Sequence, residues 1–235
     1  MARIARFVVP GLPHHVTQRG NRRERIFFET GDYALYRHWL GESCRRFGVE
    51  VWAYCQMPNH VHLILTPQDG DGLALALSRT HRLYAGFVNA RARQTGHLFQ
   101  GRFGSVALDE EHLMAAARYG ALNPVRARFV QRAEDWPHSS VRAHLAGRDD
   151  GLVRVKPLID RAPHFADLLD GEADAEAFVR LRRSELIGRP LGSAGFVAEI
   201  EKRLGRTLAP GKRGRKPRSP SRRGSTRVKT GPPPH

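Results

Sequence analysis

The pattern of hydrophobic and polar positions in the first part of the chain predicts strands that flank a helix. β-branched and aromatic residues alternate in three short segments, and apolar residues recur at helical spacing in one longer segment. A Met57-Pro58-Asn59 turn separates the last two strands and predicts a hairpin. The predicted elements cover residues 14–19 (strand), 31–47 (helix), 49–56 (strand) and 60–66 (strand).

The pattern continues with a long helix, a short strand and a second helix. These elements cover residues 73–93, 105–109 and 110–122, and Asn123-Pro124 ends or kinks the last helix. The order β-α-β-β-α-β followed by a helix is typical of the ferredoxin-like split arrangement. We therefore expect an α+β fold, in which an antiparallel sheet carries helices on one face.

Beyond residue 145 the pattern weakens. Gly and charged residues at 146–157 indicate a domain edge. Residues 172–187 and 194–204 predict two short helices, which are either a helix-turn-helix reader of DNA or a simple helical pair packed on the main domain. The basic segment 211–235 cannot bury a core and is predicted to be disordered. We expect a catalytic domain over 1–145, a helical extension over 146–210 and this tail.

Charge narrows the class of partner. The chain has 39 Lys and Arg against 23 Asp and Glu, a formal net charge of +16, which favours a polyanion such as nucleic acid. The tail supplies part of this excess, although the first 200 residues also carry a surplus of basic residues. Such a tail would add salt-sensitive affinity for any phosphate backbone.

Cysteine and hydropathy exclude other classes. Cys44 and Cys55 are the only cysteines, which leaves no cysteine zinc cage and no disulfide framework. The N-terminal segment lacks the apolar run of a signal peptide, and no stretch approaches about 18 consecutive apolar residues. We expect a cytoplasmic, nucleoid-associated protein without a membrane segment.

A pair of histidines carries the most specific chemistry. His60 and His62 lie two apart in a predicted strand, so both side chains project from one face and could share a divalent cation. The alternative is a pair of partly buried histidines that bond to the backbone. Val61 between them points into the core, which predicts that the two imidazoles lie on the exposed face of the sheet.

Tyrosine is the candidate nucleophile beside such a pair. A phenol has a pKa near 10 and attacks phosphorus well only where the phosphate charge is neutralised. Tyr84 and Tyr119 both lie on helices that could flank the sheet, and the residues alone leave both open. Asn123, four residues after Tyr119, could add an oxygen ligand to the cation.

Four blocks in this order resemble the REP-associated tyrosine transposases, which belong to the HUH single-tyrosine family. The blocks are HHVTQRGN, AYCQMPNHVHLILTP, GHLFQGRF and YGALNPVRARFV, and the resemblance covers roughly residues 1–145. It implies Tyr119 as the nucleophile, His60, His62 and Asn123 as ligands of Mg²⁺ or Mn²⁺, and single-stranded DNA with hairpin repeats as the substrate. Gly120 departs from the family, where a bulkier apolar residue follows the tyrosine, and is expected to loosen that helix.

Several basic residues are candidates for DNA contact, because arginine binds phosphates and stacks on unpaired bases. Phe103 is expected to pack in the core instead. The candidates are Arg19, Asn21, Arg22, Arg23, Arg102 and Arg126.

Three functions remain open on the sequence. The favoured one is a metal-dependent enzyme that nicks and rejoins single-stranded DNA through a 5′-phosphotyrosine intermediate. The alternatives are a hairpin-binding protein that has lost cutting, and a metal-free RNA-binding protein, which would need aromatic residues on the exposed strands. Monomer and homodimer are both compatible with the sequence.

Overall fold

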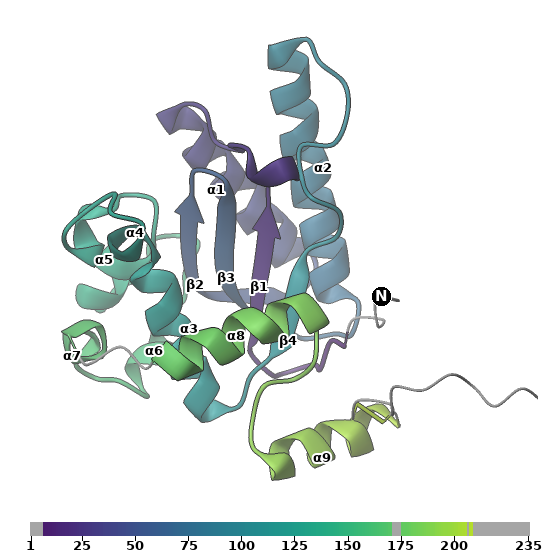
Figure 1. Cartoon of the computed structure of the whole chain (residues 1–235), viewed down its shortest axis with the longest axis vertical. Coiled ribbons are helices and arrows are strands. Elements are labelled where there is room, and N and C mark those ends of the chain that lie inside the picture. The colour runs from purple at the N-terminus through teal and green to yellow at the C-terminus, as the bar shows by residue number, and fades with distance from the viewer. Residues whose placement is uncertain (1–6, 171–174, 206, 209–235) are drawn as a thin grey trace, which may run out of the picture.

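The computed structural model of the chain describes residues 7–170, 175–205 and 207–208 (Figure 1). Four strands in this part form one antiparallel sheet in the order β2-β3-β1-β4. They are β1 (His14–Arg19), β2 (Val49–Met57), β3 (His60–Pro67) and β4 (Gly104–Ala107). Helix α1 (Thr30–Arg46) joins β1 to β2, and α2 (Gly72–Ala92) joins β3 to β4. The predicted ferredoxin-like order is confirmed.

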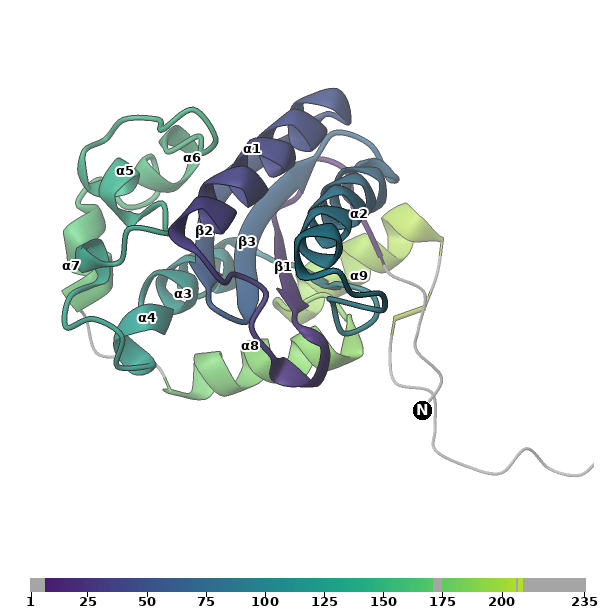
Figure 2. The same cartoon turned by 90° about the horizontal axis from the view of Figure 1, so that it is seen from above.

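Helices α1 and α2 lie together on one face of the sheet (Figure 2). Their apolar side chains pack against the inward residues of the strands, Val16 of β1 and Val61, Leu63 and Leu65 of β3, all of them at most 1 % exposed. This face is the main hydrophobic core, and Phe103 joins it as expected. Burial of so much apolar surface is the principal source of stability for the fold.

The opposite face of the sheet is also covered, which corrects the expectation that helices pack on one face only and leave the imidazoles exposed. Helix α3 (Glu110–Ala121) and helix α8 (Ala175–Ile187) lie over it (Figure 2). The reason lies in the strands, because Ile64 of β3 and Val106 of β4 point to this side and need apolar cover. A strand that is apolar at consecutive positions is buried on both faces.

The remaining elements are short, apart from the last helix. Helix α9 (Ala194–Leu204) buries Ile200 against Phe7 and Val9, whereas α8 packs on α3 and β4. Each predicted C-terminal helix therefore packs on the main domain, which favours the simple helical pair over a helix-turn-helix reader. The short elements are η1 (Asn21–Arg23), α4 (Asn123–Arg126), η2 (Ala133–Asp135), α5 (Val141–Leu145), α6 (Lys156–Ile159) and α7 (Phe165–Asp170).

The predicted domain edge at 146–157 is tied to the sheet. Asp150 accepts a hydrogen bond of 2.6 Å from the Tyr54 hydroxyl, the Arg154 amide donates to the Val51 carbonyl, and Val153 is buried in the main core. The division into domains stays a prediction, and the basic tail at 211–235 lies outside the described residues. No helix within the described ranges is both long and apolar enough to cross a bilayer.

Candidate active site

Tyr119 lies near the end of α3 with its ring against the imidazoles of the sheet. The N-cap residue of the helix is Asp109, whose carboxylate accepts a hydrogen bond from the His112 amide. Ala116 packs on the sheet, and Tyr119, three residues later, shares that side of the helix. The Tyr119 ring meets His62 edge-on with 5.1 Å between ring centres, and the residue is only 3 % exposed.

His60 and His62 project from the same side of β3, as their spacing predicts. Their ring centres are 4.9 Å apart and the ring planes are nearly perpendicular. His62 is buried, whereas His60 at the start of the strand is partly exposed. Val61 between them is fully buried in the core on the other side of the sheet. The two imidazoles therefore lie on the side of β3 that faces α3.

Asn123 completes the group. It is the first residue of α4, two positions after the end of α3, and its Nδ2 donates a hydrogen bond of 2.8 Å to Nε2 of His62. The chain bends at this point because Pro124 occupies the first turn of α4, and the bend keeps Asn123 beside the strand. The structure thus brings together His60 and His62 of β3, Tyr119 of α3 and Asn123 of α4, which lie far apart in the sequence.

These side chains fit a divalent cation with mixed nitrogen and oxygen ligands. Within the described ranges, no three His, Cys, Asp or Glu residues lie close enough to hold a metal. An oxygen beyond the two imidazoles must therefore come from another residue type, and the Asn123 amide is beside His62. Two imidazoles and one neutral oxygen suit Mn²⁺ better than Mg²⁺, which prefers oxygen ligands throughout.

Two further residues hold the imidazoles, and the sequence analysis did not single them out. His15 on β1 hydrogen-bonds through Nε2 to Nδ1 of His62 at 3.0 Å, and the two ring planes are 1° apart. Asn59 in the β2–β3 turn accepts at Oδ1, 2.6 Å from Nδ1 of His60. Burial lowers the pKa of His15 to about 3, so its ring is neutral at physiological pH.

The predicted basic loop lies beside His60. Arg19 ends β1 directly opposite His60, and the exposed loop with Asn21, Arg22 and Arg23 follows. The Asn59 side chain donates to the Arg23 carbonyl, which ties the loop to the turn before the histidine pair. Gly20 permits this path, because a Cβ there would lie 2.2 Å from the Glu24 carbonyl oxygen.

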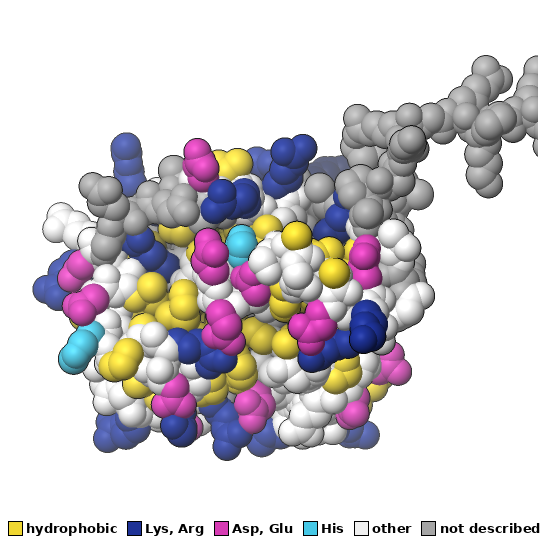
Figure 3. All heavy atoms as spheres, turned by 90° about the horizontal axis from the view of Figure 1, so that it is seen from below, with side chains coloured by type: hydrophobic (Ala, Val, Ile, Leu, Met, Phe, Trp, Pro, Cys, Tyr) yellow, Lys and Arg dark blue, Asp and Glu magenta, His cyan; other side chains and the backbone are white. Residues whose placement is uncertain are grey.

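Charge differs between the two ends of the molecule. The basic loop, drawn in dark purple, lies at the upper end of β1 in Figure 1. Figure 3 views the molecule from below, and there Asp and Glu side chains occupy the middle of the face between Lys and Arg. A polyanion is therefore attracted to the loop end more than to the lower face.

The other two candidate arginines lie in different places. Arg126 of α4 places its guanidinium 5.0 Å from the centre of the Tyr119 ring and 4.9 Å from that of Phe178. Arg102 is exposed in the segment before β4, next to Gly101, whose carbonyl accepts a weak hydrogen bond of 3.4 Å from Gln18. Arg126 therefore belongs to the tyrosine cluster, and Arg102 lies on the far side of β1 from β3.

Helix α8 covers the tyrosine. Phe178 of α8 packs on Tyr119 with 5.2 Å between ring centres, and Leu181 is buried in the same cluster. A phosphodiester would have to approach a side chain that this helix now shields. Access of such a group to the hydroxyl would need either a shift of α8 or a rotation of the phenol.

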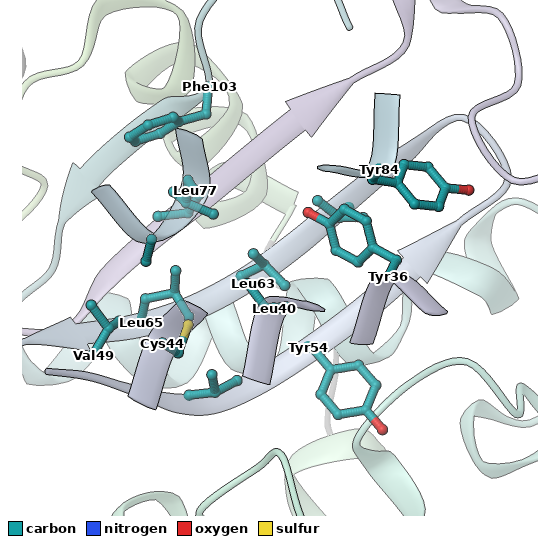
Figure 4. Close-up of a cluster of buried hydrophobic side chains, with 14 of the residues drawn as sticks. Tyr36, Leu40, Cys44, Val49, Tyr54, Leu63, Leu65, Leu77, Tyr84 and Phe103 are labelled. Atoms are coloured by element: carbon teal, nitrogen blue, oxygen red, sulfur yellow. The ribbon is translucent and has the colours of Figure 1, made fainter. Parts of the chain in front are cut away.

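Tyr84, the other candidate, is in the main core on the opposite side of the sheet (Figure 4). Its hydroxyl donates a hydrogen bond of 2.7 Å to the Ile26 carbonyl, and its ring packs on Tyr36 and Phe27. Burial raises the pKa of Tyr84 far above its usual value. Tyr84 is therefore a packing residue, and the geometry leaves Tyr119 beside the histidines.

Comparison with known proteins finds a matching family model and similar sequences. Residues 8–119 match the model of the family described as IS200-like transposases. The chain is 25 % identical over 131 residues to a protein of Haemophilus influenzae, and 28 % identical over 127 residues to one of Escherichia coli, both described as REP-associated tyrosine transposases. The matches cover 49 % and 54 % of this chain, and 74 % and 73 % of those proteins.

A solved structure shares the fold. It is that of a REP-associated tyrosine transposase bound to a REP hairpin, with a TM-score of 0.54 and 23 % sequence identity. The match covers 66 % of this chain and 90 % of the solved one. At this identity the likeness establishes the fold alone, and the α+β class expected from the sequence is confirmed.

Proposed function

We propose that the chain is an IS200-like transposase, because residues 8–119 match the model of that family and the chain is similar to the REP-associated tyrosine transposases, and that it nicks and rejoins single-stranded DNA beside a hairpin. The observation that carries the proposal is the meeting of Tyr119 with His60, His62 and Asn123. Phenol and imidazoles come from different elements, and packing alone has no need to place them together.

The phenol of Tyr119 is the proposed nucleophile. Its oxygen attacks the phosphorus of the scissile phosphodiester and loses its proton, and the bond from phosphorus to the 3′ oxygen breaks. The 3′ oxygen takes up a proton and leaves as a hydroxyl, while the 5′ phosphate stays on the tyrosine. An incoming 3′ hydroxyl can reverse the same exchange, so strands are rejoined without a nucleotide cofactor.

His60, His62 and Asn123 are the proposed ligands of Mn²⁺ or Mg²⁺. A divalent cation bound there supplies charge neutralisation at the scissile phosphate. The chain positions the reacting groups. Helix α3 holds the phenol against the imidazoles, and Arg126 lies over the ring of Tyr119. A guanidinium at this place can bind a phosphate oxygen once α8 moves aside.

The basic loop is the proposed contact for the hairpin. Arg22 and Arg23 are exposed, and the Arg23 carbonyl accepts the hydrogen bond by which Asn59 ties the loop to the site. Arg19 and Asn21 extend this surface, and Arg102 extends it along the other side of β1. The partner that fits is single-stranded DNA that carries a hairpin, bound by a protein that works in the cytoplasm as a monomer or a homodimer.

The proposal is tested by incubating the full chain with Mn²⁺ and an oligonucleotide that carries a hairpin and a single-stranded flank. We expect cleavage in the flank and a covalent protein–DNA adduct on a denaturing gel, both lost with a chelator. His62→Ala is expected to lose cleavage while it still binds the hairpin. Hairpin binding without any cleavage by the wild-type chain would contradict the proposal and indicate a binding protein.

A further inference from the structure

Two residues that are not proposed ligands contact the Nδ1 atoms of the two imidazoles: Asn59 contacts His60, and His15 contacts His62. Each histidine of a cation site can offer only one ring nitrogen to the ion, and the other nitrogen must then carry the proton. In this chain the Nδ1 atoms of both His60 and His62 are engaged by protein groups. The question is which tautomer those groups select.

For His60 the answer follows from Asn59. The Asn59 amide is oriented because its Nδ2 donates to the Arg23 carbonyl at 3.0 Å. Its Oδ1 therefore faces Nδ1 of His60 at 2.6 Å, and an amide oxygen can only accept. His60 must donate from Nδ1, which leaves the lone pair on Nε2.

For His62 the answer follows from contacts at both of its nitrogens. Asn123 presents an N–H group to Nε2 at 2.8 Å, so Nε2 is the acceptor. The proton of a neutral ring is then on Nδ1, and it is donated to Nε2 of His15 at 3.0 Å. The ring planes of His15 and His62 are 1° apart, which aligns the N–H bond with the accepting lone pair.

We propose that His15 and Asn59 are positioning residues that hold His62 and His60 in the Nδ1–H tautomer, so that both Nε2 atoms keep the lone pair that binds the cation once the Asn123 amide turns its oxygen towards the ion. This inference rests on the proposed function, because it takes the two histidines as ligands. His15 acts from β1 across the sheet, and Asn59 acts from the turn that also ties down the basic loop. The Asn59 side chain therefore contacts both the loop that is proposed to bind DNA and the imidazole of His60.

The tautomers are measured directly in the metal-free protein. Two-bond ¹H–¹⁵N correlation spectra at neutral pH distinguish a protonated Nδ1 from a protonated Nε2. We expect Nδ1–H for both His60 and His62 in the wild-type chain. A protonated Nε2 on His62 in the metal-free wild type would overturn the inference, whatever the activity of the protein.

Cation affinity supplies the second measurement, with Mn²⁺ alone as the probe and free Mn²⁺ followed by electron paramagnetic resonance. Loss of an outer-shell partner typically weakens metal binding about 10- to 100-fold. We expect that loss for His15→Leu and for Asn59→Ala, and recovery to near wild-type affinity for His15→Gln, whose amide oxygen can accept from Nδ1. Equal Mn²⁺ affinity of the wild type and His15→Leu would overturn the inference.

His14 supplies the matched control, because it neighbours His15 on β1, is equally buried and makes its hydrogen bonds to Leu12 and Val9 instead. We expect His14→Gln to lose stability without losing Mn²⁺ affinity, and an equal loss of affinity in this variant would overturn the inference in favour of a general packing effect.

If His15→Leu does not fold, His15→Gln and the wild-type spectra still decide. A wild-type chain that binds no Mn²⁺ would overturn the cation site as well, whereas equal binding in all variants would overturn this inference alone.

Discussion

Both faces of the sheet bury tyrosine side chains, but the surroundings of these tyrosines differ between the two faces. On the α1 and α2 face, Tyr36 and Tyr84 are sealed in the core and each hydroxyl has a hydrogen-bond partner nearby. On the α3 and α8 face, Tyr119 is just as buried, but its neighbours are the rings of His62 and His15 and the guanidinium of Arg126. Burial therefore does not separate the structural tyrosines from the proposed nucleophile.

What separates them is the cover over each ring. The cover of Tyr84 consists of two long helices with a large shared core. The cover of Tyr119 includes α8, one helix of 13 residues that reaches the site from the C-terminal part of the chain. A single helix opens at a lower free-energy cost than a core between two long helices, so we expect the second face to admit a substrate more readily.

The largest expected contrast is between the two tyrosines. Tyr119→Phe removes the proposed nucleophilic oxygen, so we expect no covalent adduct while hairpin binding is kept. Tyr84→Phe removes a buried hydrogen bond, so we expect about 1–3 kcal/mol lower stability with the adduct retained. Denaturing gels and urea unfolding measure the two effects. An adduct formed by Tyr119→Phe would show that the nucleophile lies elsewhere.

Acid should weaken the fold through histidines on both faces. Burial lowers the pKa of His14 to about 4, below the 6.5 of an exposed histidine, so the unfolded chain takes up the proton first. The stabilisation is fully present above pH 6.5 and is lost as the pH falls towards 4, by about 3 kcal/mol for this residue. Urea unfolding of the wild type and of His14→Gln checks it. Parallel pH dependences would contradict the assignment to His14.

The basic loop should govern affinity without governing chemistry. We expect Arg22→Ala with Arg23→Ala to weaken hairpin binding about tenfold, and to lower the slope of log affinity against log salt by about 2. The covalent step at saturating DNA should remain. Arg45→Ala, an exposed arginine at the far end of α1, is the control and should change neither quantity. An unchanged salt slope in the double variant would place the hairpin elsewhere.

Loosening the cover over Tyr119 should speed the reaction. Phe178→Leu removes about 1 kcal/mol of packing from the closed arrangement, which raises the open fraction about fivefold. We expect faster adduct formation by a similar factor at saturating DNA. Val179→Ala on the same helix is the control, since Val179 is 65 % exposed. A slower reaction in Phe178→Leu would show that α8 supports the site instead of shielding it.

The smallest expected effect concerns Gly120. The structure leaves room there, because an added Cβ would lie 3.7 Å from Cβ of His62, an ordinary contact. We expect Gly120→Ala to stabilise α3 by up to about 1 kcal/mol and to raise the melting temperature by about 2–4 °C. Thermal unfolding measures this. A loss of stability would mean that the helix needs glycine to approach the strand.

Local pattern predicted much of the fold and the side of the sheet on which His60 and His62 lie, whereas the choice of Tyr119 over Tyr84 came from the family resemblance. The strands at His14–Arg19 and His60–Pro67 follow from their alternation, and the spacing of His60 and His62 placed both on one side of the sheet. The order of elements then fixes the antiparallel sheet, since short connections and a hairpin leave few other topologies.

The parts that escaped prediction depend on contacts between distant residues. His15 and His62 are 47 positions apart, and neither residue carries a local signal that it meets the other. The cover by α8 depends on segment 175–187 returning to the sheet, which the helical pattern alone does not specify. The apolar run Leu63-Ile64-Leu65 was the available signal, because it indicates a strand buried on both faces.

The central claim is that Tyr119 becomes linked to DNA, and mapping the linkage tests it most directly. The adduct formed with Mn²⁺ and a hairpin oligonucleotide is digested with protease and nuclease, and the modified peptide is identified by mass spectrometry. The account predicts one modified residue, Tyr119, joined to the 5′ phosphate of a nucleotide. A nucleotide on any other residue, or a linkage through a 3′ phosphate, would contradict it.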